Sequence, residues 1–442
     1  MAKEFSRRTF IDGALACGAV LAAGAIAGGA HSAQAAERPG PKPGKPILLR
    51  DVTVGGSKNI NVLIADGVIK DMGPAVVADG AEVVDCGGAL LLPSFIDPHV
   101  HLDKTRIGSS RLHHKKTGSV AERAANEIRL RQELHHDPFV FGSNLVRQFA
   151  LKGTTHIRSH IDIDNSIKLR HVEAILKVRE KYKDYMDIQL VAFPQSGIVK
   201  SPGVAALMEE AVRMGVDIVG GLDPQVFDND LNGHLDAVFA IAEKTGAPLD
   251  LHLHEPGETG LKTFKAVVER AKALGMKDKI NLSHAFALGQ IPKADLEAIL
   301  ADFKELGISV ASSGSGTTKY PPVEPLFEAG VLYSGMSDNI QDMWSPLGNG
   351  DQLERAMLIS FTQGFRADEP LMLTYEMVTA NPGKLLGVKD HGLANVKVGA
   401  VANLTAVHAE DIPYAVLQRP PRLFTIRNGA FLMRDGELYM PV

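Results

Sequence analysis

The chain has 442 residues, of which 22% are charged and 45% hydrophobic, and its formal net charge at pH 7 is −5. This composition is typical of a globular chain with enough apolar side chains for a large core. The acidic balance argues against nucleic-acid binding, which needs concentrated Lys and Arg. No apolar run after residue 36 reaches the roughly 18–20 residues that cross a bilayer, so we expect no stable membrane insertion.

The first 36 residues have the order of parts of a twin-arginine export signal. Arg7 and Arg8 precede an Ala/Gly-rich apolar stretch at 13–30, and small residues at 33–36 fit an A-x-A cleavage site. A short buried helix is the alternative interpretation, but an Ala/Gly run makes a poor core helix. We therefore expect an interaction with the twin-arginine export machinery and a periplasmic or secreted location.

Residues 37–46 predict a Pro-rich linker, and β-type runs then occupy both ends of the remaining chain. At 47–90 and at 395–442, polar and apolar residues alternate, and Asp-Gly or Asn-Gly turns separate the runs. This pattern indicates antiparallel hairpins. We expect the two ends to assemble into one small composite β-sandwich. Cys86 is the only cysteine outside the predicted signal, so no internal disulfide can form there.

Residues 91–394 alternate short apolar runs with longer stretches of helical spacing, which is typical of a parallel sheet covered by helices. Eight such units predict an α/β fold, the (β/α)8 TIM barrel. The strands are expected at 91–98, 154–160, 188–193, 217–221, 249–254, 280–284, 309–312 and 331–334. Helices are expected at 167–183, 204–214, 235–245, 261–274 and 294–306.

Polar side chains stand at the ends of several predicted strands, where a TIM barrel gathers its functional groups. The first strand ends in His99-Val100-His101, and extended backbone projects both imidazoles to the same side. His252, His284 and Asp338 follow strands five, six and eight. An isolated H-x-H pair is a weak signal, but chance explains the whole set poorly. We interpret it as a metal site.

This arrangement resembles the amidohydrolase superfamily, and within it the cytosine deaminase branch. The resemblance extends over most of the chain after the predicted signal. It rests on PHVHLDK at 98–104, VAFPQSG at 191–197 and SDNIQDMW at 337–344. Triazine N-alkylamide hydrolases of the N-isopropylammelide type share these stretches. Strand four ends without the Lys that dinuclear members of the superfamily carry there, which favours a single metal ion.

The resemblance implies one divalent metal ion, iron or zinc, bound by His99, His101, His252 and Asp338. Such an ion lowers the pKa of a coordinated water. Asp338 would accept the proton of that water, and His284 would stabilise the tetrahedral intermediate. Glu255 would shuttle a proton to the departing amine; the alternative interpretation is a surface Glu beside a turn.

Three more residues are implied to bind substrate. Gln195 would hydrogen-bond the amide-like edge of a ring, since a carboxamide both donates and accepts. Trp344 would stack on a flat heterocycle, with a core or lid position as the alternative. Asn339 stands where cytosine deaminases carry a second acid and is closer to the triazine hydrolase version. Lys104 is interpreted as a salt-bridge partner, and His254 as a structural residue that faces away from His252.

We therefore expect a metal-dependent amidohydrolase that deaminates a small nitrogen heterocycle by hydrolysis. Hydrolysis of an N-alkyl amine or amide C–N bond on a triazine-like ring is the alternative, because it needs the same ligands. A non-catalytic periplasmic binding protein is a third reading, against which the complete ligand set argues. Relatives in this branch often assemble, so a homo-oligomer is compatible with the sequence, and no feature supports a nucleic-acid partner.

Overall fold

The computed structural model describes residues 44–114, 119–314, 318–389 and 391–442. The expected export signal at 1–36 and most of the expected linker at 37–46 lie outside the described residues. The strands that the structure describes form two eight-stranded sheets. None of the described helices combines the length and apolar character that a membrane crossing requires.

The middle of the chain forms the expected TIM barrel, with eight parallel strands that follow one another in sequence order. The strands are β5 (Phe95–Val100), β6 (Thr154–Asp162), β7 (Asp187–Phe193), β8 (Ile218–Leu222), β9 (Leu249–His252), β10 (Ile280–Ser283), β11 (Ser309–Ser312) and β12 (Tyr333–Gly335). A parallel bridge between Val100 and Asp338 joins the two edges of this sheet. The Asp338 N–H donates to the His99 carbonyl there, at 2.9 Å.

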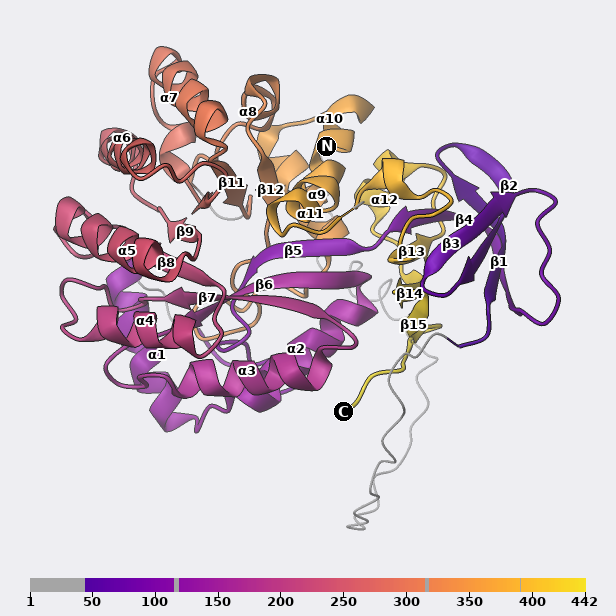
Figure 1. The fold of residues 1–442 in the computed structure, drawn as a ribbon, viewed down its shortest axis with the longest axis horizontal. Helices are drawn as coiled ribbons and strands as arrows, with labels where there is room; N and C mark the ends of the chain where they lie inside the picture. The colour runs from indigo at the N-terminus through magenta and orange to yellow at the C-terminus, as the bar shows by residue number, and fades with distance from the viewer. Residues whose placement is uncertain (1–43, 115–118, 315–317, 390) are drawn as a thin grey trace, which may run out of the picture. The chain divides into compact units, whose positions relative to one another are not determined.

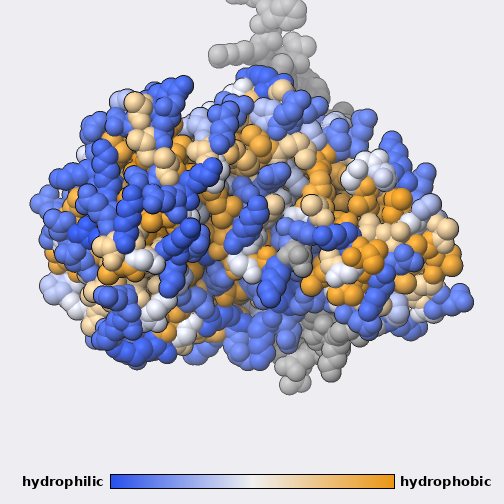
Figure 2. Space-filling view, turned by 45° about the horizontal axis from the view of Figure 1, so that its top comes forward, coloured by the Kyte–Doolittle hydropathy of each residue, from blue (hydrophilic) through white to orange (hydrophobic). Residues whose placement is uncertain are grey.

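Helices surround the strands, and those expected from the sequence correspond to α3 to α7 (Figure 1). In α3, Val172, Ile175 and Val178 are buried at helical spacing, which places one apolar face on the barrel. Other faces carry charged residues, and Figure 2 shows a largely hydrophilic face of the molecule with smaller hydrophobic patches. The described helices are α1 (Val120–Glu133), α2 (Pro138–Leu151), α3 (Arg170–Tyr182), α4 (Val204–Arg213), α5 (Leu231–Thr245), α6 (Gly257–Ala273), α7 (Lys293–Leu306), α8 (Val323–Ala329), α9 (Gln352–Gln363), α10 (Asp368–Glu376), α11 (Ala380–Leu385) and α12 (Ile412–Gln418), with short 3-10 turns η1 (Phe286–Gly289) and η2 (Leu393–Asn395).

The second sheet is built from both ends of the described chain, as expected (Figure 1). Its hydrogen bonds link one continuous sheet in the order β16-β15-β14-β13-β4-β1-β2-β3. An antiparallel bridge from Val68 in β3 to Val401, shortly before β13, joins its two halves. The strands are β1 (Ile47–Val54), β2 (Ser57–Ala65), β3 (Val68–Gly73), β4 (Glu82–Pro93), β13 (Leu404–Val407), β14 (Arg422–Arg427), β15 (Ala430–Arg434) and β16 (Glu437–Leu438).

The first barrel strand begins later than the expected range of 91–98. Residues 91–93 belong to β4, where Leu91 pairs with Ala406 of β13. Ser94 separates the two strands, and its N–H donates to the Asn403 carbonyl at 2.9 Å. The sequence pattern alone did not mark this crossing, because only Pro93 and Ser94 separate the apolar residues of the two strands.

A buried ion pair joins the composite sheet to the barrel. Arg422 at the start of β14 donates to Asp351, whose carboxylate also caps the N-terminus of α9. The Arg422 Nε donates to the Lys152 carbonyl at 3.1 Å, and its guanidinium lies 5.1 Å from the Phe95 ring centroid. The side chains of both partners are nearly inaccessible, at 1% and 6% exposed. Such a pair is costly to break on one side only.

We expect Arg422→Met to lower the free energy of unfolding by about 3–5 kcal/mol, because Asp351 is left buried without its main partner. Thermal unfolding of the full chain measures this. The control is Arg50→Met, which removes an exposed ion pair with Asp85 and should leave the melting temperature almost unchanged. Equal shifts for the two variants would contradict the assignment of Arg422 as the bridge.

Candidate active site and metal centre

Most of the residues singled out in the sequence line one pocket at the carboxyl ends of the barrel strands. Its lining consists of His101, Lys104, Phe193, Gln195, Leu222, His252, His254, His284, Asp338, Asn339 and Trp344. The His99 ring is adjacent, with its centroid 4.5 Å from that of His252. The free volume is about 30 Å³, which suits one or two water molecules.

Among the described residues, four overlapping groups of side chains could hold an ion, and two of them contain the predicted ligands. One consists of His99, His252 and His284, and the other of His99, His101 and Asp338. Within each group the candidate ligand atoms lie within 4.8 Å of one another. Nε2 of His101 lies 3.3 Å from Oδ1 of Asp338, and Nε2 of His99 lies 3.6 Å from it. The two groups together contain all four predicted ligands and His284.

Burial sets the charge state of this cluster. It lowers the pKa of His101 to about 4, with a further contribution from Lys104, and it lowers the pKa of His252 and His284 well below the usual value. Burial acts to raise the pKa of Asp338, but its close contacts with His101 and His99 outweigh that effect, so that this pKa lies well below its ordinary range. Neutral imidazoles beside an ionised carboxylate are what metal ligation requires.

The polar atoms of the cluster fit a divalent cation. Among the described residues, His99 Nε2, His101 Nδ1 and both ring nitrogens of His252 and His284 are buried without a hydrogen-bond partner. A buried polar atom left unpaired costs about 1–3 kcal/mol, and a shared cation would remove that cost. Imidazole and carboxylate ligands suit iron, zinc and similar ions.

The backbone at two of these side chains is in the left-handed region. His284 has φ = 68° and Asp338 has φ = 62°, which is uncommon for residues with a side chain. Both are held by strong backbone hydrogen bonds, from the His284 N–H to Ala311 at 2.7 Å and from the Asp338 N–H to His99 at 2.9 Å. Such conformations cluster at functional sites, where the surrounding structure pays for them.

A series of hydrogen-bonded, buried polar groups orients the His99 ring through its Nδ1 atom. Nδ1 of His99 lies 2.8 Å from Ser283 Oγ, which donates to Asp250 Oδ1 at 2.7 Å. Asp250 is fully buried, and its other oxygen accepts from Arg158 Nη1 at 2.9 Å. The hydroxyl of Ser283 gives its proton to Asp250 and is left to accept from His99. This arrangement puts the ring proton on Nδ1 and leaves the Nε2 lone pair facing the cluster.

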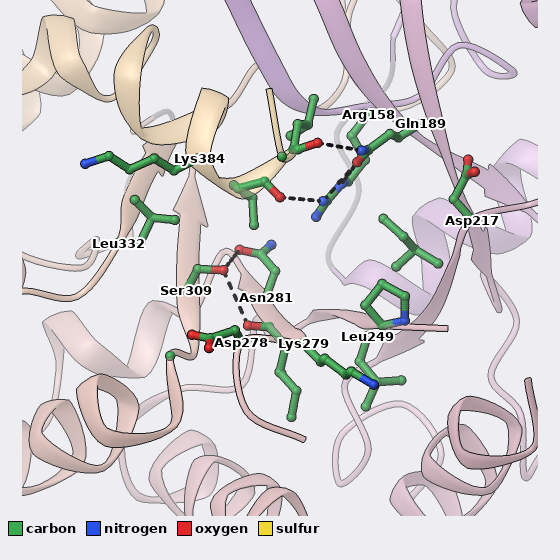
Figure 3. A pocket seen from close by; sticks show the side chains of 17 residues that line it. Arg158, Gln189, Asp217, Leu249, Asp278, Lys279, Asn281, Ser309, Leu332 and Lys384 are labelled. Atoms are coloured by element: carbon green, nitrogen blue, oxygen red, sulfur yellow. Dashed lines mark hydrogen bonds between the residues drawn. The ribbon is translucent and has the colours of Figure 1, made fainter. Parts of the chain in front are cut away.

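Arg158, which donates to Asp250, lies in the wall of a second cavity at the amino-terminal ends of the barrel strands. The cavity has a volume of about 550 Å³ and is larger than the histidine-lined pocket. Figure 3 shows Arg158 and Gln189 on one wall, where Arg158 donates to Gln189 Oε1 at 3.1 and 3.2 Å. The Arg158 Nη2 also donates to the Leu385 carbonyl at 3.3 Å. Arg158 and Gln189 are both paired, and the histidine cluster lies at the smaller pocket, so we assign the chemistry to that pocket.

The predicted substrate-binding residues all lie in that pocket. Gln195 is nearly inaccessible and accepts from the Lys104 ammonium. Asn339 donates to Asp342 Oδ2 at 2.5 Å. Trp344 donates through its indole N–H to Glu127 of α1. The structure therefore brings Gln195, Asn339 and Trp344 together in one pocket.

Glu255 and His254 occupy places that differ from the expectation. Glu255 is absent from the residues that line the pocket; its carboxylate accepts from the Gln225 N–H at 2.6 Å, from the Val226 N–H at 3.2 Å and from Thr263. His254 lines the pocket instead, with its ring centroid 4.1 Å from that of His284. Residues two apart on extended backbone point to the same side, so the interpretation of His254 as facing away was wrong.

His254 forms a close pair with Asp223. Its Nδ1 lies 2.8 Å from Asp223 Oδ2, and its N–H donates to Oδ1 at 2.6 Å. Burial acts to lower the pKa of His254, but Asp223, followed by Asp338, outweighs it, so that the pKa is raised. The signal in the sequence was the Asp that follows strand four, at the same end of the barrel.

A buried charge cluster lies beside the pocket; the sequence indicated Lys104 as a salt-bridge partner and Asp162 as a supporting residue, but not that the two would pair. Lys104 Nζ lies 3.0 Å from Asp162 and 3.6 Å from Glu127. Arg131 of α1 also pairs with Asp162, at 2.5 Å, and with Glu127, at 2.9 Å. This cluster holds α1, the helix between the first two barrel strands, against the pocket. Lys104, helix α1 and Asp162 belong to different segments of the chain, so only the fold brings their charges together.

Known proteins resemble this chain over most of its length. Residues 82–431 match the amidohydrolase family. The chain belongs to that family. It is 30% identical over 84% of its length to N-isopropylammelide isopropyl amidohydrolase from Pseudomonas sp. (strain ADP), of which 93% is covered. Amidohydrolases typically use a metal, which matches the candidate ligands found here.

Two solved structures of this family are similar over nearly the whole described fold. N-isopropylammelide isopropylaminohydrolase from Burkholderia multivorans is 37% identical, with a TM-score of 0.84 over 89% of this chain and 100% of the other. 5-Methylcytosine deaminase from Klebsiella pneumoniae, liganded with phosphonocytosine, is 25% identical, with a TM-score of 0.77 over 90% of this chain and 100% of the other. The similarity supports hydrolysis of C–N bonds as the type of reaction.

We expect Ser283→Ala to weaken zinc binding by the full chain about 10–100-fold, because His99 loses the acceptor that fixes its tautomer. Competition with a chromophoric chelator measures the dissociation constant. Ser309→Ala is the matched control, since Ser309 is a buried serine on the next strand that donates to Asn281 rather than contacting His99. Unchanged affinity in Ser283→Ala, or an equal loss in both variants, would contradict the role assigned to this chain of residues.

Proposed function

We propose that the protein is a metal-dependent amidohydrolase that releases an exocyclic amine from a carbon of a small nitrogen heterocycle. The observation that carries the proposal is the cluster of neutral, buried imidazoles and one ionised carboxylate beside a pocket lined by Gln195, Asn339 and Trp344. A planar polar ring suits two carboxamides and an indole. The overall reaction adds water across the C–N bond, leaving a ring carbonyl and a free amine.

The ligand set His99, His101, His252 and Asp338 would hold one divalent ion, iron or zinc. When bound, that ion supplies Lewis acidity and makes hydroxide available near neutral pH. Asp338, as the ionised carboxylate, takes the proton of the attacking water. His284, which lines the pocket, hydrogen-bonds the oxygen that adds to the ring carbon. The amine leaves once it has gained a proton.

Glu255 and His254 are the two candidates for the residue that transfers a proton to the amine. Glu255 is the residue expected from the sequence, and burial raises its pKa, but its oxygens are engaged by Gln225, Val226 and Thr263. His254 faces the pocket, and Asp223 fixes its tautomer with Nε2 directed away from that carboxylate. We assign the proton transfer to His254, and to Glu255 the role of holding the loop after β8 against β9.

Ammonia and an alkylamine are both candidate products. The cytosine deaminase-like sequence features favour deamination. The 30% and 37% identity to two N-isopropylammelide hydrolases favours release of an alkylamine from a triazine-like ring. The chemistry of attack is the same for both, so the leaving amine alone separates them.

The test is amine release by the zinc- or iron-loaded full chain on cytosine, isocytosine, ammelide and N-isopropylammelide. We expect ammonia or isopropylamine, identified by chromatography, and none from Asp338→Asn, which lacks a ligand and the proton acceptor. His254→Asn should lower kcat by about 10²–10⁴-fold, whereas Glu255→Gln, which keeps most of its hydrogen bonds, should lower it far less. If the protein binds one equivalent of metal but releases no amine from any ring, the result would favour the alternative of a non-catalytic binding protein.

We propose in addition that residues 1–36 direct export through the twin-arginine pathway to the periplasm or beyond. The support is the Arg7-Arg8 pair followed by the apolar stretch and the small residues at 33–36. In a bacterium that has this pathway, replacing both arginines with lysine should leave the full chain in the cytoplasm. Equal export of the two forms, measured by fractionation, would contradict the proposal.

A further inference from the structure

The predicted metal ligands lie on both sides of the barrel seam, the place where β5 meets β12. His99 is on β5, His101 directly follows it, and Asp338 follows β12. These two strands stand at the ends of the sheet order, and an isolated bridge between Val100 and Asp338 joins them. The width of the seam therefore sets the distance from the imidazoles to the carboxylate, which a shared ion requires to be short and constant.

One carboxylate, that of Asp97, spans the seam. Its Oδ1 accepts from the N–H of His99 and from the N–H of Ser337, at 3.2 Å each. Ser337 directly precedes Asp338, so a single oxygen holds the backbone on both sides of the metal site. Asp97 is fully buried, and its other oxygen accepts from Nε2 of Gln352 at 2.8 Å. Gln352 therefore helps to fix how this carboxylate lies.

Both hydrogens of the Gln352 carboxamide are used at the seam. Nε2 donates to Asp97 Oδ2 and to Ser337 Oγ, the latter at 3.1 Å. The side chain is fully buried, and its Oε1 has no hydrogen-bond partner among the described residues. A position that only needed filling would be more stable with an apolar side chain, because an unpaired buried acceptor is destabilising. The two donors are therefore what Gln352 contributes here.

Helix α9 supplies a further contact to the same side of the seam. Arg355, one turn after Gln352, donates through Nη2 to the Ser337 carbonyl at 3.3 Å and through Nη1 to the Ser313 carbonyl. The N–H, the hydroxyl and the carbonyl of Ser337 are thus all engaged. Asp338, the next residue, has φ = 62°, a conformation that persists only where its surroundings over-determine it.

The start of α9 is itself fixed. Asp351 accepts from the N–H groups of Leu353 and Glu354 as the N-cap, and it pairs with Arg422 of the composite sheet. Gln352 is therefore the first residue of a helix whose N-terminus is anchored to the second sheet. Its carboxamide cannot leave the seam without a movement of that helix.

We propose that Gln352 is a positioning residue for the metal site. By donating to Asp97 and Ser337, it sets the width of the seam and with it the distance between His99 and Asp338. Gln352 does not line the pocket, so it acts through these contacts alone. Its loss leaves every metal ligand in the chain but frees the two sides of the site to separate. This inference rests on the proposed function, because it takes His99 and Asp338 as ligands of one ion.

The zinc affinity of the full chain, measured by competition with a chromophoric chelator, tests the inference. Gln352→Met removes both donors at a similar side-chain length. We expect the dissociation constant to rise about 10–100-fold, as when another outer partner of a metal ligand is lost. The matched control is Gln363→Met at the other end of α9, where the side chain is hydrogen-bonded to the backbone of Pro321 and Val323. It should leave the constant unchanged.

A spectroscopic readout separates positioning from a loss of stability. The visible absorption of cobalt(II), bound in place of zinc, depends on ligand geometry. We expect it to change in Gln352→Met and to stay the same in Gln363→Met. If Gln352→Met does not fold, Gln352→Asn decides, because it keeps the carboxamide but draws it back from Asp97.

An exchange of donor and acceptor should restore both readouts. In the double variant Asp97→Asn with Gln352→Glu, the amide oxygen at position 97 still accepts the two backbone N–H groups. Its amide nitrogen donates to the carboxylate at position 352. We expect most of the wild-type zinc affinity and the wild-type cobalt spectrum to return.

Unchanged zinc affinity and an unchanged cobalt spectrum in Gln352→Met would overturn the inference, as would an equal loss in Gln363→Met or no recovery in the double variant. The outcome is separable from that of the amine-release assay. A zinc affinity that depends on Gln352 in a chain that releases no amine would support the inference and leave the proposed reaction wrong. Amine release with an affinity that does not depend on Gln352 would leave the reaction intact and overturn the inference.

Discussion

The imidazoles of His101, His252 and His284 lie at the point where the barrel strands end, and they are almost inaccessible to water. Burial opposes a charge on an imidazole, so these rings stay neutral and keep a lone pair. The same environment keeps Asp338 ionised only because two of the rings donate to it or lie close to it. Neutral imidazole nitrogens around one ionised carboxylate form a site that suits a cation. The rest of the structure supports these rings in their neutral form and the carboxylate in its ionised form.

Two sets of hydrogen bonds and ion pairs support this cluster of neutral imidazoles and one carboxylate. On the inner side of the barrel, Ser283 and Asp250 orient His99, and Arg158 neutralises the buried Asp250. On the side of the pocket, Lys104 and Arg131 neutralise carboxylates that would otherwise repel one another. Both sets draw on residues from strands or helices that lie far apart in the sequence. The barrel therefore brings these buried charges from distant segments next to opposite charges.

Glu255 and His254 show how such pairing decides which side chain reaches the pocket. Glu255 and His254 are neighbours in the sequence, yet only His254 faces the pocket, because Gln225, Val226 and Thr263 hold the Glu255 carboxylate elsewhere. Asp223, at the end of the neighbouring strand, gives His254 a fixed tautomer. Hydrogen bonds from the loop after β8 and from α6 therefore decide which of the two side chains faces the pocket.

The sequence by itself determined the barrel, the composite sheet from both ends and the positions of His99, His101, His252, His284 and Asp338. The periods of strands and helices are local properties, and an H-x-H pair at a strand end already implies a shared direction. Tertiary structure alone decided that the chain crosses between sheets at Ser94, that His254 replaces Glu255 in the pocket, and which charged groups Gln195 and Asn339 contact. These features depend on hydrogen bonds and ion pairs between distant residues, and no local pattern records which partner a buried polar group will meet.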